Sequence, residues 1–213
     1  MKRICGMPGG KVSKTCGCEC ETPMPENGSL EDLVSWWIAA KRPFFKKMLR
    51  FFGEGSLDLA IKRAAAKGSA EGESCYYSHQ NRISKEKLSQ WQALLRRNKA
   101  EISECEKESF EDLLGLLEGF KPNGIGPLTC YDTAFRISAK LGCLPKKVVH
   151  LHAKAQIPGT KQYPKKDVPR LVADFPPTVK QRLKAYEIED FLCVCQDKLK
   201  PSMFKEMLKQ GKS

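Results

Sequence analysis

The residues with the clearest chemical potential form a short run of glycine and proline, Gly124-Ile125-Gly126-Pro127-Leu128. Two glycines one residue apart allow a tight turn that leaves backbone amides exposed, and a proline directly after them suits the first turn of a helix. The amides at the start of that helix and the positive end of its dipole would face whatever occupies the turn. The sequence therefore predicts an anion site with the backbone amides of Gly124 to Leu128 as donors.

Basic residues follow this turn closely in the sequence. No acidic residue lies between Asp132 and Asp167, and that interval contains eight basic residues: Arg136, Lys140, Lys146, Lys147, Lys154, Lys161, Lys165 and Lys166. Cations that neutralise phosphates release counterions, which gives an affinity that falls steeply with salt. We expect the first four of them to extend a phosphate contact made by the turn. The alternative is an ordinary solvated face.

The run resembles the hairpins of the helix-hairpin-helix superfamily of DNA-binding motifs. Gly124, Ile125, Gly126, Pro127 and Thr129 match that pattern, and Cys130 replaces its usual alanine. The resemblance covers about residues 109–141 and implies that the hairpin amides hold a backbone phosphate, of DNA rather than RNA, without reading base sequence. The nucleic-acid-binding residues expected in this way are Gly124, Ile125, Gly126, Pro127, Leu128, Thr129, Arg136, Lys140, Lys146 and Lys147.

Two longer segments are similar to parts of uncharacterised bacterial proteins. The first runs from Gly124 to Gly142 and includes Tyr-Asp-Thr-Ala-Phe-Arg-Ile at 131–137. The second is His-Gln-Asn-Arg-Ile at 79–83. This similarity implies no particular activity.

Catalysis of the kind found in helix-hairpin-helix glycosylases is not expected. The lysine that such lyases carry two positions after the second glycine is replaced by Leu128, and 144–150 contains no carboxylate where their aspartate follows the second helix. Asp132 falls inside that helix, where we expect it to pair with Arg136 at i,i+4. The enzyme alternative is a nucleic-acid-processing activity of another chemistry. Its candidates for proton transfer or metal binding are His150 and His152, which would share one side of an extended segment.

The cysteines are expected to be free thiols in a reducing, cytoplasmic environment. Cys16, Cys18 and Cys20 cluster in a Gly- and Pro-rich arm at residues 1–29, with a spacing unlike that of structural zinc sites. No cofactor is required, and the alternative is a soft metal bound to these three thiols. We expect Cys75, Cys105, Cys130 and Cys143 to be small core residues.

The apolar pattern predicts a mostly α fold, with one compact multi-helix domain over residues 30–213. The expected helices begin after Ser29, at Pro43, near Leu57, after Ser84 and after Ser109, and end near Arg42, Gly53, Lys67, Ser103 and Gly119; a last one precedes Pro201. In the second of them, Phe44, Phe45, Leu49 and Phe52 would be buried, with Lys46, Lys47 and Arg50 exposed. Residues 148–152 resemble a strand, and 158–169 a basic loop.

Composition and charge favour a polyanionic partner. The chain has 213 residues, 37 basic and 25 acidic, for a formal net charge of +12. No apolar run approaches the ~18 residues of a membrane span, so no membrane partner is expected. Nucleic acid is the first expectation. The alternative without nucleic acid is a helical protein–protein interaction module whose basic surface meets an acidic protein.

Overall fold

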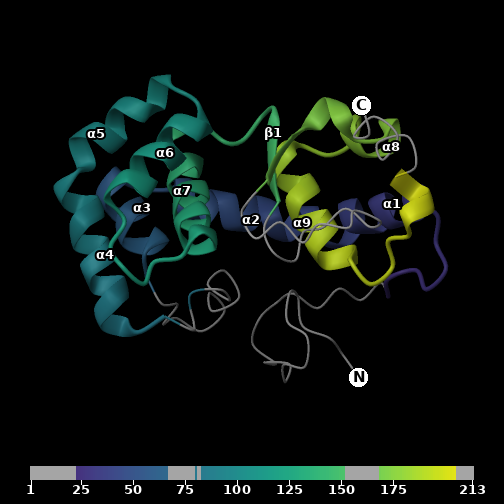
Figure 1. Ribbon diagram of the computed structural model, residues 1–213, viewed down its shortest axis with the longest axis horizontal. Coiled ribbons are helices and arrows are strands. Elements are labelled where there is room, and N and C mark those ends of the chain that lie inside the picture. Colours follow the sequence, from purple (N-terminus) through teal and green to yellow (C-terminus); the bar gives the residue numbers. More distant parts are fainter. Residues whose placement is uncertain (1–22, 67–79, 81–82, 152–167, 205–213) are drawn as a thin grey trace. The chain divides into compact units, whose positions relative to one another are not determined.

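The computed structural model describes residues 23–66, 80, 83–151 and 168–204, and it is mostly helical (Figure 1). Across those residues, no helix is long and apolar enough to cross a membrane. They form two compact units. Unit 1 takes its described residues from 45–144, and unit 2 takes its own from 23–44 and 145–204. The sequence predicts one domain over 30–213, because nothing in the apolar pattern indicates that the chain leaves one unit and later returns to it.

Unit 1 is built around α7 (Pro127–Leu141), which packs against α3 (Leu57–Ala64) and α6 (Phe110–Phe120) (Figure 1). The residues expected on its buried face are confirmed as buried: Cys130, Ala134, Ile137 and Leu141. The Trp91 indole of α4 (Lys85–Arg97) donates to Thr133 Oγ1 of α7 at 3.2 Å. The core of the unit therefore lies on several sides of α7.

Serine side chains cap four of the described helices. Ser29, Ser56, Ser84 and Ser109 each accept a hydrogen bond from the third backbone amide of the helix that follows, which confirms the starts expected at Ser29 and Ser109. At Ser29 and Ser109, an aspartate at that third position also accepts from the serine amide. Such reciprocal capping satisfies two amides that the helix itself leaves without acceptors.

The long helix expected after Ser84 is in fact two helices. α4 ends at Arg97, and α5 (Lys99–Glu104) follows Asn98 before a short 3₁₀ helix, η3 (Cys105–Lys107). The Asn98 amide side chain donates to the Leu94 carbonyl at 2.9 Å. Asparagine side chains compete in this way with helical hydrogen bonds, and the apolar pattern does not show the interruption.

Two details of the expected helices also differ. α2 (Arg42–Gly53) buries Phe45, Met48 and Phe52, whereas Phe44 and Leu49 are only half-buried. α3 ends at Ala64 rather than near Lys67. Exposure of Lys46, Lys47 and Arg50 is confirmed.

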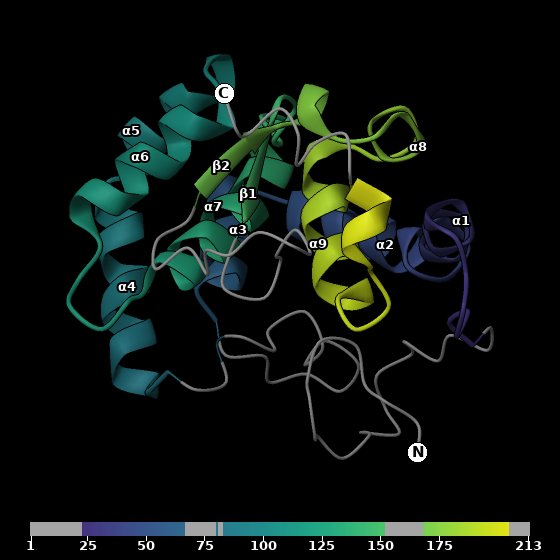
Figure 2. The same ribbon diagram turned by 45° about the vertical axis from the view of Figure 1, so that its right-hand side comes forward.

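Unit 2 combines helices with a two-stranded sheet. Its helices are α1 (Leu30–Ala40), η4 (Val172–Asp174), α8 (Pro177–Lys180), α9 (Ala185–Cys195) and η5 (Pro201–Phe204). β1 (Val148–Leu151) confirms the expected strand and pairs antiparallel with β2 (Val168–Leu171), with Val148 opposite Leu171 (Figure 2). β2 was not predicted, because Pro169 lies inside it and proline argues against a strand.

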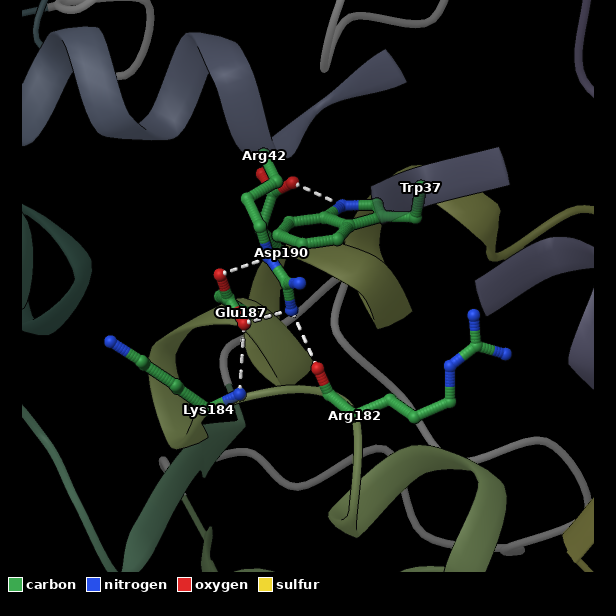
Figure 3. A network of polar contacts seen from close by, with 6 residues as sticks. All are labelled: Trp37, Arg42, Arg182, Lys184, Glu187 and Asp190. Carbon is green, nitrogen blue, oxygen red and sulfur yellow. Dashed lines mark hydrogen bonds and ion pairs between the residues drawn. The ribbon is translucent and has the colours of Figure 1, made fainter. Parts of the chain in front are cut away.

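A polar network joins α9 to the helices at the start of unit 2 (Figure 3). The buried carboxylate of Glu187 accepts from Arg42 Nε at 2.8 Å, from Arg42 Nη2 at 2.7 Å and from the Lys184 amide at 2.9 Å. Arg42 also donates to the Arg182 carbonyl, and the Trp37 indole donates to Asp190 at 2.8 Å. These partners satisfy the buried charge, so the network has a structural role.

Candidate functional site

The turn between α6 and α7 consists of residues 121–126. Gly124 has φ +94°, a backbone conformation that L side chains rarely adopt, so a glycine is required there. The Ile125 amide donates to the Pro122 carbonyl at 3.1 Å, and the Ile125 side chain is 4% exposed. The turn is thus anchored by the apolar residue between its two glycines, as expected.

The N-terminus of α7 is open. Its first helical hydrogen bond runs from the Cys130 amide to the Gly126 carbonyl at 3.0 Å, and Gly126 at the N-cap provides no side chain to cap the helix. The amides of Gly126, Leu128 and Thr129 precede that bond and have no acceptor within the helix, and Pro127 has no amide hydrogen. Three backbone donors therefore lie at one helix end.

The fold does not require a glycine at position 126. Its φ of −77° is open to any residue, and a Cβ added there would meet nothing within 4 Å. Gly124 is therefore the position with the special conformation, and a side chain at Gly126 would leave the turn intact. A glycine at an open N-cap leaves room for a ligand to approach the backbone closely.

Lys87 of α4 lies against the turn and was missed by sequence analysis. A Cβ built on Gly124 would lie 2.8 Å from Lys87 Cδ and 2.9 Å from Cε, with the ammonium nitrogen closer still. The Lys87 side chain therefore extends across Gly124 and brings a positive charge to the same turn. Nothing in the sequence pairs Lys87 with the glycines, because packing of unit 1 brings them together.

Arg136 does not belong to this site. It is 5% exposed, its Nη1 donates to the Ala64 carbonyl at 3.2 Å, and its Nη2 lies 3.8 Å from Asp132 Oδ2. The pairing of Asp132 with Arg136 is thereby confirmed. Arg136 was expected to extend the phosphate contact, but a guanidinium buried in this way cannot reach an external anion, so that expectation is corrected.

The other expected cations are not part of the turn. Lys140 is half-exposed near the end of α7, roughly 20 Å along the helix axis from Gly126 at ~1.5 Å per residue. Lys146 and Lys147 are exposed but belong to unit 2. The local site in unit 1 therefore consists of the turn, the start of α7 and Lys87.

Residues from the two segments with a bacterial resemblance meet at the carbonyl of Ala64. Gln80 is fully buried and donates from Nε2 to the Ala64 carbonyl at 2.9 Å, the same oxygen that Arg136 contacts. Gln80 Oε1 has no hydrogen-bond partner. The shared carbonyl connects α3, α7 and the segment that contains Gln80.

The proposed metal or proton-transfer residues do not form a centre in the described part of the chain. His150 is 8% exposed within β1, while His152, Cys16, Cys18, Cys20 and Cys75 lie outside the described residues. Where the structure describes the chain, no group of three or more His, Cys, Asp or Glu side chains could hold a metal ion. Cys105, Cys130 and Cys143 are buried as expected, and burial raises the pKa of the Cys130 thiol to about 12.

The described residues of unit 1 carry only a small excess of positive charge. They include 14 lysines or arginines and 11 aspartates or glutamates. Total charge therefore does not identify a binding surface within this part of the chain. What matters is where the exposed cations lie relative to the open helix end.

No protein-family model, curated protein or solved structure matches this chain. The chemistry available at the turn follows from its own geometry: three backbone donors, the positive end of a helix dipole and one ammonium group. Such a combination suits an oxyanion with several acceptor oxygens, such as a phosphate.

Proposed function

We propose that unit 1 binds nucleic acid through its sugar-phosphate backbone at the turn between α6 and α7. In this proposal the turn acts as a helix-hairpin-helix element and holds one phosphate, most favourably of DNA. Amides of Gly126, Leu128 and Thr129 donate to the phosphate oxygens, and Lys87 neutralises part of the charge. All of these donors contact the phosphate and none contacts a base, so binding is independent of base sequence.

The observation that carries the proposal is the lack of a capping side chain at Gly126. A side chain at this N-cap would cause neither strain nor a clash, and yet the position has no capping side chain. The helices that begin after Ser56, Ser84 and Ser109 in the same unit all use a serine there. An external anion would satisfy the amides that those serines satisfy elsewhere.

Fluorescence anisotropy with labelled single-stranded and duplex DNA across a salt series tests the proposal. Gly126→Val should place two methyl groups over the amides and raise the Kd at least about tenfold while the circular dichroism spectrum is unchanged. Lys87→Gln should weaken binding and reduce the slope of log K against log salt by about 0.7–0.9, as expected for one lost phosphate contact.

Two matched variants provide the controls. Gly115→Val adds the same side chain at an exposed glycine of α6 where a Cβ also meets nothing within 4 Å. Lys85→Gln removes a charge from an exposed lysine at the start of α4. Both should bind DNA like the parent protein. Unchanged DNA affinity in Gly126→Val and Lys87→Gln would reject the site. If the protein instead binds another protein, and heparin but not DNA competes with that binding, the partner is an acidic protein.

A further inference from the structure

The outer face of α2 carries three cations and no acidic side chain. Lys46, Lys47 and Arg50 are all exposed, and α2 contains no acidic residue between Arg42 and Gly53. Lys46 and Arg50 are four residues apart and Lys47 and Arg50 three apart, so the cations share one side of the helix. Like charges at these spacings repel each other, so the arrangement is unfavourable for an isolated helix.

The opposite face of α2 packs into the core of unit 1. Phe52 is 0% exposed, Phe45 packs against Phe135 with ring centroids 6.3 Å apart, and Met48 is also buried. These three apolar side chains are therefore unavailable for insertion into a membrane. The exposed side of the helix carries Lys46, Lys47 and Arg50.

The cations of α2 differ in their pairing from two half-buried lysines of the same unit. Lys99 pairs with Asp58, and Lys121 lies 3.9 Å from Glu118. Among the described residues, Lys46, Lys47 and Arg50 form no such ion pair. At the end of α2, Arg63 donates to the Phe51 carbonyl and its guanidinium lies 4.1 Å from the Phe51 ring centroid, which fixes this end of the helix.

The contact between α2 and α7 gives the approximate distance from the turn to the end of α2. A Cβ on Gly53 would lie 3.1 Å from the Ala139 carbonyl oxygen, so α2 ends against the C-terminal part of α7. The α7 axis between Gly126 and Ala139 is roughly 20 Å long at ~1.5 Å per residue. This span corresponds to roughly six nucleotides at the ~3.4 Å spacing of one strand in a duplex.

From the charge separation and this length we infer that the outer face of α2, formed by Lys46, Lys47 and Arg50, is a second phosphate-binding surface for the strand held at the turn. The inference rests on the proposed function, because the same strand contacts both surfaces. The turn holds one phosphate, and α2 contacts phosphates several nucleotides away. Affinity should therefore depend on oligonucleotide length, and α2 should supply that dependence.

The test compares DNA hairpins whose duplex stems have about 4 and about 12 base pairs, shorter and longer than the span, by anisotropy across a salt series. The combined variant Lys46→Gln, Lys47→Gln, Arg50→Gln should weaken binding of the longer oligonucleotide at least about tenfold at low salt. Its salt slope should fall by about 2.7, which is three contacts at ~0.9 each. Binding of the shorter oligonucleotide should change less than about twofold.

The control removes three exposed cations from α3 and α4 of the same unit, Lys62→Gln, Arg96→Gln and Arg97→Gln, and therefore changes net charge equally. It should keep the length dependence. An α2 variant that binds the longer oligonucleotide like this control would overturn the inference. So would an equal loss for both lengths, or binding to phosphatidylserine vesicles without binding to oligonucleotides.

The Gly126→Val variant separates failure of the inference from failure of the proposed function. It should weaken binding of both oligonucleotides. If it binds both like the parent protein while the α2 variant still loses the longer one, the turn is rejected and the α2 surface is retained. If Gly126→Val loses both and the α2 variant loses neither, the turn is retained and the α2 surface is rejected.

Discussion

Gly124 and Gly126 have different reasons to be glycine, although the sequence shows them as a symmetric pair. Gly124 has a positive φ and Lys87 lies across it, so a side chain there would be strained and would displace the lysine. Gly126 has an ordinary extended conformation and open space above its α-carbon. The first glycine therefore serves the fold, and the second is the residue at which binding can be tested without disturbing the fold.

Arg136 provides a prediction at the same scale. Arg136→Met should retain much of the buried volume but remove the hydrogen bond to the Ala64 carbonyl and the ion pair with Asp132. We expect a loss of about 1.5–3 kcal/mol in the free energy of unfolding, measured by urea denaturation, because a charged hydrogen-bond donor is removed from a buried acceptor. The folded variant should bind DNA within about twofold of the parent protein.

The opposite result would place Arg136 in the DNA-binding site. An Arg136→Met protein of unchanged stability that binds DNA tenfold more weakly would show that the guanidinium contacts the ligand. The sequence could not decide between these roles, because a basic residue on a helix looks the same whether its side chain is exposed or bonded to a buried carbonyl. Ile125 could be predicted, since an apolar residue between two glycines has only the core to occupy.

At the scale of elements, helix starts follow from local chemistry more directly than helix ends. Ser29 and Ser109 could be recognised because the serine and the aspartate three residues later satisfy each other's amides over a short distance. The break at Asn98 and the strand β2 depend on contacts that local patterns do not contain. Lys87 belongs to the same class, since α4 reaches the turn only through the packing of unit 1.

The cap of α6 gives a pH-dependent prediction. Hydrogen bonds from the Ser109 side chain and backbone hold the pKa of Asp112 below its usual value. The folded pKa is thus lower than the unfolded one, so this carboxylate adds stability above about pH 4, and the contribution is lost as the pH falls through the folded pKa. Ser109→Ala should cost about 1 kcal/mol at pH 7 and lower Tm by roughly 2–4 °C.

Thermal melts at pH 7 and at about pH 3 check the sign of this effect, since the carboxyl groups of Asp and Glu protonate across that interval. The loss caused by Ser109→Ala should shrink at the lower pH. Ser84→Ala is the matched control, because the third residue of α4 is Lys87 and this cap includes no carboxylate. A loss from Ser109→Ala that is equal at both pH values would contradict the coupling between the cap and Asp112.

For the whole molecule, the position of charge is more informative than its total. The net charge of +12 favours a polyanionic partner, but the described part of unit 1 carries only a small excess of positive charge. The cations that matter for the proposed function are Lys87 at the turn and the three on the outer face of α2. Only the second group could be recognised from its spacing in the sequence, and the structure shows that its apolar neighbours Phe45 and Phe52 belong to the core.

The most direct test of the central proposal is a ¹H–¹⁵N titration of the labelled protein with a short oligonucleotide. We expect the largest chemical-shift changes at the amides of Gly126, Leu128 and Thr129, because these are the donors assigned to the phosphate. The amide of Gly115, an exposed glycine in the middle of α6, should not shift. Saturable binding that leaves the three α7 amides unperturbed and shifts other surfaces would contradict the proposed site.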